Sequence, residues 1–266
     1  IGPFTFNSVR FFVGFLAIIP LALLFEAKKL KKEFRFDTKT FIILSLLIGV
    51  SLFLGSALQQ VALLYTDVAN AAFFTIYYVP MVPIIIFIFK KDFLHWSVWP
   101  SVILCLIGGY LLTNFQDATV RLGDTLVVLG ALFWSTHIIF TGMIVKKYNL
   151  PLTIGAIQTL LVALFSFIIG LFSEEFVIAN ILNEIDSILY AGILSGGFAF
   201  VLQIYAQRNI TPAPAAIIFS LEGVFATIAA WFLLNQILGI NNLLGCFFIL
   251  SGVLLSQLVP LIRKAN

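Results

Sequence analysis

Glu222 is the residue of this sequence best placed to do chemistry, because it is an acid in the middle of the apolar stretch APAAIIFSLEGVFATIAAWFLL. If that stretch spans a membrane, an ionised carboxylate at its centre costs at least about 2.5 kcal/mol. Glu222 must then face a wet cavity, carry a proton, or pair with a base. It would bind a substrate ammonium group or couple transport to protons; the structural alternative is a protonated carboxyl that hydrogen-bonds a neighbouring helix.

The stretch FFTIYYVPMVP supplies a second group of polar candidates. At helical spacing, Thr75 and Tyr78 share one face, with Tyr77 beside them. Pro80 and Pro83 remove backbone hydrogen bonds and predict a kink that opens carbonyl groups to a ligand. The alternative is a packing kink whose tyrosine hydroxyls bond neighbouring helices.

Further polar or aromatic residues lie inside apolar stretches, and each has two interpretations. Gln59 and Gln203 could orient a substrate or hold helices together. His137 could relay protons, because imidazole titrates near neutral pH, or it could be a satisfied polar group. Trp134 could stack on a substrate or pack in the core. Arg10 could bind a carboxylate, or its side chain could extend to the membrane surface.

The composition places these residues in a membrane protein. The 266 residues are 61% hydrophobic and only 10% charged, whereas soluble domains have roughly 25% charged residues. The mean hydropathy is +1.11. Because about 20 apolar residues span a bilayer, the sequence predicts one all-α polytopic membrane domain with nine segments: 4–25, 41–65, 68–89, 97–114, 122–145, 152–172, 187–207, 212–234 and 239–262.

The basic residues predict an orientation. Alternate connections, among them 26–40, collect thirteen of the 15 Lys and Arg residues, and the other connections are mainly acidic. Basic residues are enriched on the cytoplasmic side, so we expect a cytoplasmic C-terminus with residue 1 on the outer side. Because the basic residues lie in short loops, the net charge of +3 gives no sign of a nucleic-acid partner.

An internal repeat runs through the chain. Gln59 and Gln203 match at an offset of 144 (203 − 59 = 144), which also aligns ANAAFF with APAAII and pairs Tyr78 with Glu222. Further upstream, Pro3 and Pro151 match at an offset of 148 (151 − 3 = 148). We therefore predict two inverted five-helix repeats, 1–117 (helices 2–5) and 118–266 (helices 6–10), with the polar pair at their interface.

The segment 122–145 has no upstream counterpart in the sequence. We expect about 30 further residues before residue 1, which would form the first transmembrane helix and complete ten. The alternative is a protein with nine helices by nature.

These features resemble the drug/metabolite transporter superfamily, and within it the EamA-type transporters with ten helices. The resemblance covers essentially the whole chain and is carried by PFTFNSVRFFVGFLAIIPLAL, ALQQVALLYTDVANAAFFTIYYVPMVPIII, GDTLVVLGALFWSTHIIFTGMIVKK and LQIYAQRNITPAPAAIIFSLEGVFATIAAWFLL. The family often has Glu-Pro where this chain has Glu222-Gly223. The resemblance implies export or exchange of metabolites, amino acids or drugs at a central cavity in the inner membrane.

We therefore predict a secondary transporter of small metabolites, with amino acids the leading class, that works by alternating access. The expected partners are a small-molecule substrate and the lipid bilayer, with proton coupling as an open alternative, in a monomer or homodimer. The sequence contains no catalytic constellation or metal-ligand cluster, so we expect neither an enzyme nor a cofactor. A broad drug exporter is one alternative; a membrane-embedded enzyme or structural subunit is another.

Overall fold

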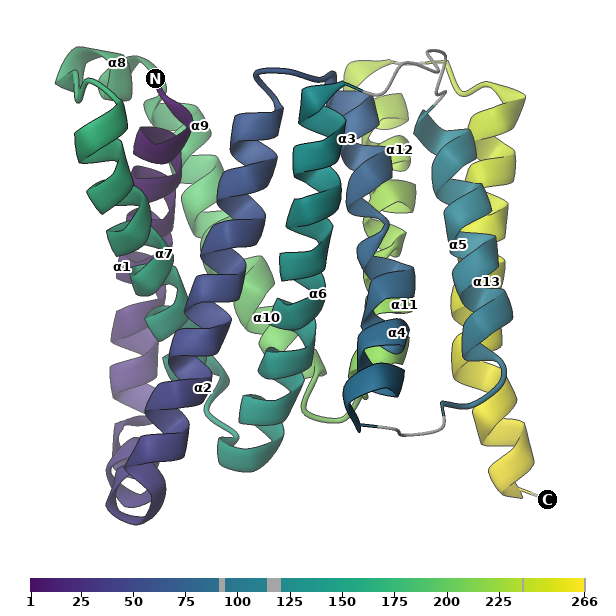
Figure 1. Cartoon of the computed structure of the whole chain (residues 1–266), viewed down its shortest axis with the longest axis horizontal. Coiled ribbons are helices and arrows are strands. Elements are labelled where there is room, and N and C mark those ends of the chain that lie inside the picture. The colour runs from purple at the N-terminus through teal and green to yellow at the C-terminus, as the bar shows by residue number, and fades with distance from the viewer. Residues whose placement is uncertain (91–93, 114–120, 236, 266) are drawn as a thin grey trace. The chain divides into compact units, whose positions relative to one another are not determined.

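The computed structural model describes residues 1–90, 94–113, 121–235 and 237–265 (Figure 1). The predicted repeat boundary at 117 and 118 lies outside these residues. The described part folds into helices: α1 (Pro3–Phe25), α2 (Ala27–Ala62), α3 (Val68–Thr75), α4 (Tyr78–Lys90), α5 (Val98–Thr113), α6 (Leu122–Tyr148), α7 (Pro151–Ser173), α8 (Ile178–Asn183), α9 (Ile185–Leu189), η1 (Tyr190–Ala199), α10 (Phe200–Ala206), α11 (Pro212–Phe219), α12 (Leu221–Leu234) and α13 (Ile240–Ala265).

The membrane spans follow the apolar stretches of the sequence. In the described part, eight helical stretches are long and apolar enough to cross a bilayer, and Val98–Leu112 is a shorter apolar helix. The ends of these stretches agree with the nine predicted segments to within about one helical turn. The chain is therefore an all-α, multi-pass membrane protein, as the composition predicts.

The helices group into two compact units. The first contains residues 1–61 and 139–210, and the second contains residues 62–138 and 211–266. Each unit thus combines segments of both predicted repeats, and α6 contributes its two ends to different units. The two compact units therefore do not coincide with the two repeats predicted along the chain.

In the first unit, α1 and α7 pack against each other (Figure 1). Each helix has 23 residues and begins with proline, at Pro3 and Pro151. Proline suits this first position because its missing N–H would have no partner inside the helix. The two helices start and end at the same offset of 148 (151 − 3 = 148; 173 − 25 = 148), which is the offset that predicts the repeat.

Close backbone contact joins α1 to η1 in the first unit. A Cβ added to Gly14 would lie 2.9 Å from the Gly192 carbonyl oxygen, and a Cβ added to Gly192 would lie 2.6 Å from the Arg10 carbonyl oxygen. The segment η1 is π-helical over ten residues, a rare form that is seen mostly as single turns. Glycine at these positions is required by the approach of the two backbones.

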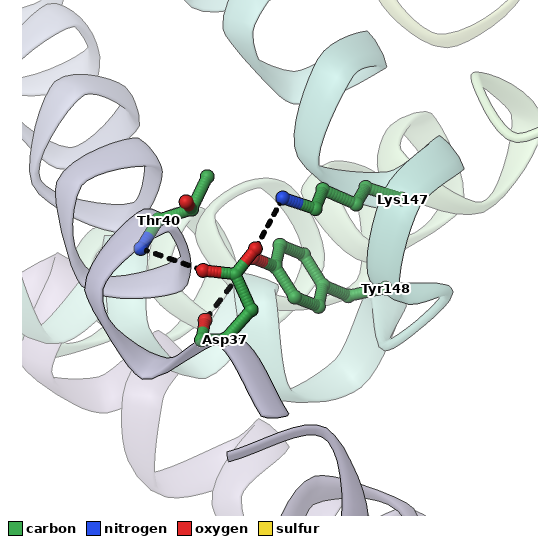
Figure 2. A network of polar contacts seen from close by, with 4 residues as sticks. All are labelled: Asp37, Thr40, Lys147 and Tyr148. Carbon is green, nitrogen blue, oxygen red and sulfur yellow. Dashed lines mark hydrogen bonds and ion pairs between the residues drawn. The ribbon is translucent and has the colours of Figure 1, made fainter. Parts of the chain in front are cut away.

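The helix α2 is bent at Asp37, where φ is −152° and ψ is 61°. Residues 27–36, which the sequence predicts as a loop, form the helical part before the bend. Beyond it, the Asp37 carboxylate accepts a hydrogen bond from the Thr40 N–H at 3.3 Å and pairs with Lys147 of α6, while the Tyr148 hydroxyl donates to it at 3.2 Å (Figure 2). Asp37 thereby starts the transmembrane part of α2 and ties it to the end of α6.

Two long apolar segments of the second unit are interrupted at corresponding positions. The helix α3 ends at Thr75 and α4 begins at Tyr78, whereas α11 ends at Phe219 and α12 begins at Leu221. The starts and the ends of α3 and α11 both match at the offset of 144 (212 − 68 = 144; 219 − 75 = 144). At the two breaks, Ile76 and Ser220 donate their N–H groups to carbonyl oxygens three residues back, at 3.1 and 3.3 Å.

The helices α5 and α13 also pack against each other in the second unit (Figure 1). A Cβ added to Gly108 of α5 would lie 2.7 Å from the Gly245 carbonyl oxygen, and a Cβ added to Gly252 of α13 would lie 2.8 Å from the Ser101 carbonyl oxygen. Gly108 and Gly252 match at the offset of 144 (252 − 108 = 144), and so do Ser101 and Gly245 (245 − 101 = 144). A glycine of each helix therefore packs against the backbone of the other helix, at positions that correspond in the two repeats.

Candidate functional site

Glu222 and Tyr78 lie just beyond the two helix breaks of the second unit. Tyr78 is the first residue of α4, and Glu222 is the second residue of α12. Tyr78 is buried, with 7% of its surface exposed, and it belongs to the same compact unit as Glu222. The two residues that the sequence offset pairs therefore occupy matching positions in the second unit, each at the start of the helix that follows a break.

The Glu222 side chain lies on an exposed face of α12. Ala226 and Ala229, four and seven residues further on, are exposed on the same face. The next residue along the chain, Gly223, lies against α5, where an added Cβ would be 3.2 Å from Leu112. Glu222 and the two alanines lie in the apolar span Pro212–Leu233, with Glu222 near its middle.

Two serines contact the broken helices in the second unit. The Ser135 hydroxyl, which is fully buried on α6, lies 3.4 Å from the Tyr78 carbonyl oxygen and donates to the Ala131 carbonyl at 2.7 Å. The Ser220 hydroxyl donates to the Ile217 carbonyl at 2.6 Å. Polar groups thus accompany the backbone at both interruptions, as broken membrane helices require.

Sequence reasoning missed these two serines, although Ser135 stands in the stretch WSTH between Trp134 and His137. For Ser220, the available signal was its position at the break between α11 and α12. This signal can be recognised only after the break has been located.

Thr75 and Tyr77 are separated from Tyr78 by the interruption. Thr75 ends α3, and its hydroxyl donates to the Ala71 carbonyl at 2.7 Å. Tyr77 lies in the break, and its ring packs edge-on against Phe73 and Phe74, each at 5.7 Å between ring centroids. Thr75 and Tyr78 both lie in the apolar helical stretch Asn70–Phe89, which is interrupted here, so a shared face for the two residues stays a prediction.

Trp134 and His137 lie together on α6, in the part that belongs to the second unit. Their rings are nearly perpendicular, at 88°, with centroids 6.1 Å apart. His137 is fully buried, and Trp134 is partly exposed. The imidazole is therefore enclosed in the packed part of the unit, with the indole as its aromatic neighbour.

Gln59 and Gln203 belong to the first unit instead. Each is half-buried and lies three residues before the end of its helix, α2 or α10. The predicted site residues therefore fall into two sets, with the glutamines in the first unit and Thr75, Tyr77, Tyr78, Trp134, His137 and Glu222 in the second.

The family follows from comparison with known proteins. A model of the EamA-like transporter family matches residues 121–258, which is more than half of the chain. The chain belongs to this family. EamA-like transporters are membrane transporters, so the buried polar groups described above lie in a protein that moves small molecules across a bilayer.

Relatives of this EamA-like transporter support the assignment. An uncharacterized transporter of Archaeoglobus fulgidus is 30% identical over 263 residues, 97% of this chain and 77% of that protein. The uncharacterized transporter YoaV of Bacillus subtilis is 25% identical over 99% of this chain and 90% of that protein. A protein crystal structure is similar with a TM-score of 0.80 and 16% sequence identity, and the match covers 100% of this chain and 90% of the chain in that structure. At this identity the similarity supports the fold alone.

Proposed function

We propose that this EamA-like transporter is a secondary transporter of small metabolites that carry an amine and an apolar body, with amino acids as the leading class. Glu222 carries the proposal, because it is an exposed acid in the middle of an apolar span, at the position that matches the buried Tyr78 in the other broken helix. A carboxylate binds an ammonium group by charge-assisted hydrogen bonds. Aromatic faces such as those of Trp134 and Tyr77 suit the apolar body.

Alternating access between two inverted repeats is the proposed mechanism. Matching offsets support it, since α1 and α7 begin and end at the offset of 148, and α3 and α11 end before their breaks at the offset of 144. Broken helices related in this way are typical of secondary transporters, whose substrates bind at the interruption. The proposed location is the inner membrane, with a cytoplasmic C-terminus, on the distribution of basic residues.

The proposed roles of the site residues divide by unit. Glu222 binds the amine or carries a coupling proton, and Tyr78 supports it. Thr75, Tyr77, Trp134 and His137 are the further candidates for substrate contact in the second unit, and Gln59 and Gln203 are the amide candidates in the first unit. Monomer and homodimer are both compatible with this division.

The decisive experiment is transport by the protein in liposomes, with and without Glu222→Gln. We expect the variant to lose most of its uptake of radiolabelled amino acids, because the neutral amide cannot balance an ammonium charge. If Glu222 couples protons, residual transport will also lose its dependence on pH. Glu175→Gln is the matched control, since Glu175 is an exposed acid outside the proposed site.

Ligand-induced thermal stabilisation separates amino acids from drugs as substrates. A set of stabilising ligands confined to amino acids supports the proposed class. Stabilisation by many unrelated apolar cations would instead assign the chain to broad drug export. An unchanged transport rate and pH profile in Glu222→Gln would remove this residue from the mechanism.

A further inference from the structure

A short basic helix connects α1 to the transmembrane part of α2. Residues 27–39, here called the basic strap, comprise the helical part before the bend at Asp37 and the first residues of the transmembrane part. The basic residues of the strap are Lys28, Lys29, Lys31, Lys32, Arg35 and Lys39. The strap follows α1, whose last residues Leu24 and Phe25 are 76% and 75% exposed. Such exposed apolar residues belong in the hydrocarbon, so the strap lies at the level of the lipid headgroups.

The first turn of the strap is held by the connection between α6 and α7. The Lys29 ammonium group donates to the Asn149 carbonyl oxygen at 2.8 Å. One turn earlier, the buried Glu26 carboxylate accepts the Thr153 N–H at the start of α7, also at 2.8 Å. Leu30 packs against the apolar cluster that contains Tyr148 and Leu150. One face of the strap thus packs against the rest of the first unit.

The far end of the strap is held in the same way. Asp37 pairs with Lys147, and its carboxylate accepts the Tyr148 hydroxyl at 3.2 Å (Figure 2). The strap is therefore fixed at both ends to the connection that contains Tyr148 and Asn149. Its exposed side chains are held in place by the fold instead of projecting from a free loop.

Three lysines of the strap point away from these contacts. Lys28, Lys31 and Lys39 are exposed, and none of them has a hydrogen-bond or ion-pair partner among the residues the structure describes. Lys28 and Lys31 are three residues apart and so share one helix face. The neighbouring Lys29, by contrast, is turned inward to Asn149. The strap thus presents a cationic surface that the described part of the protein leaves without counter-charges.

We propose that Lys28, Lys31 and Lys39 bind the anionic headgroups of the adjacent lipid leaflet. Basic residues next to a transmembrane helix attract anionic lipids. The bound lipid holds the strap against the bilayer, and the strap in turn holds the α6–α7 connection. Anionic lipid therefore stabilises this end of the first unit, independently of the substrate that the protein carries.

The test measures binding of dansyl-labelled phosphatidylglycerol to the purified full chain in neutral detergent micelles. Binding is followed by the fluorescence anisotropy of the dansyl group, and dansyl-labelled phosphatidylcholine is the neutral comparison. Each exposed lysine is expected to contribute about five-fold in affinity, so the combined Lys28→Gln, Lys31→Gln and Lys39→Gln variant loses roughly one hundred-fold. Added salt weakens binding to the unaltered protein, because the charges are exposed.

Two control variants separate lipid binding from folding. The combined Lys28→Arg, Lys31→Arg and Lys39→Arg variant keeps the charges and retains the affinity for phosphatidylglycerol. Lys29→Gln removes the contact to Asn149, while Glu26 and Asp37 still hold the two ends of the strap, so we expect it to lose far less lipid affinity than the combined glutamine variant. Lipid affinity and thermal stability, measured on the same variants, distinguish loss of the binding surface from loss of the fold. A variant that is not monodisperse is replaced by the corresponding single substitutions.

Three outcomes overturn the proposal. The first is equal affinity of the unaltered protein for phosphatidylglycerol and phosphatidylcholine. The second is full affinity for phosphatidylglycerol in the combined glutamine variant. The third is displacement of the labelled lipid by free glycerol phosphate as readily as by unlabelled phosphatidylglycerol, which would assign the lysines to a soluble anion.

Discussion

Glu26 and Glu174 cap each other's helices. Glu26 follows α1, and its carboxylate accepts the Thr153 N–H in the first turn of α7 at 2.8 Å. Glu174 follows α7, and its carboxylate accepts the Thr5 N–H in the first turn of α1, also at 2.8 Å. The two acids match at the offset of 148 (174 − 26 = 148), and so do the two threonines (153 − 5 = 148). The antiparallel pair is thus closed at both ends by the same contact.

Removal of either cap is expected to destabilise the first unit. A carboxylate at a helix N-terminus satisfies N–H groups that have no partner in the helix. Glu26→Ala and Glu174→Ala should each cost about 1 kcal/mol, which lowers the thermal midpoint by about 3 °C for a chain of this size. Thermal unfolding in detergent measures both, and the costs should add because the caps lie at opposite ends of the pair.

Glu175→Ala is the control for the two caps. Glu175 is the exposed neighbour of Glu174, so its removal changes the net charge without removing a cap. We expect its thermal midpoint to match that of the unaltered protein. A midpoint as low as that of Glu174→Ala would show that charge, and not capping, accounts for the loss.

Alanine at the α5–α13 crossing is expected to separate these helices. The Cβ of Gly108→Ala would meet the Gly245 carbonyl oxygen at 2.7 Å, and that of Gly252→Ala would meet the Ser101 carbonyl oxygen at 2.8 Å. Backbone atoms cannot turn away, so each substitution should cost about 1–3 kcal/mol in thermal unfolding. Gly239→Ala is the control, since its nearest neighbour is an Asn242 side-chain atom at 3.4 Å. Equal midpoints for all three variants would contradict this account of the crossing.

The Asp37–Lys147 pair should contribute little by itself. The two side chains are 36% and 46% exposed, so a double-mutant cycle should give a coupling of about 0.5 kcal/mol that decreases with salt. Asp37→Ala alone should cost more, about 1 kcal/mol, because Thr40 also loses its capping group. A coupling that accounts for the whole cost of Asp37→Ala would mean that the cap contributes nothing.

Tyr78 and Glu222 should act as one unit in transport. Because Tyr78 and Glu222 occupy matching positions after the two helix breaks of the second unit, we expect Tyr78→Phe and Glu222→Gln to be non-additive. The double variant should be no slower in liposome transport than the slower single variant. Tyr77→Phe is the matched control, since that ring packs on Phe73 and Phe74. Strictly additive losses would indicate independent roles.

The sequence contains the correspondence between the two capping acids of α1 and α7, but the repeat alone does not show that these acids are caps. The offset of 148 that aligns Pro3 with Pro151 also aligns Glu26 with Glu174. In the sequence both acids are simply parts of polar connections. The offset states which residues correspond, but it does not state that corresponding helices touch.

The sequence by itself determined where the chain crosses the membrane, because a bilayer demands about 20 apolar residues wherever they occur. It also paired Tyr78 with Glu222 by offset. The tertiary structure decided which helices pack together and where the helices break. It placed Gln59 and Gln203 in one compact unit and Glu222 in the other. These outcomes depend on contacts between residues far apart in the chain, such as the glycine contacts between α5 and α13. The pattern of apolar residues within one segment does not indicate which other segment it packs against.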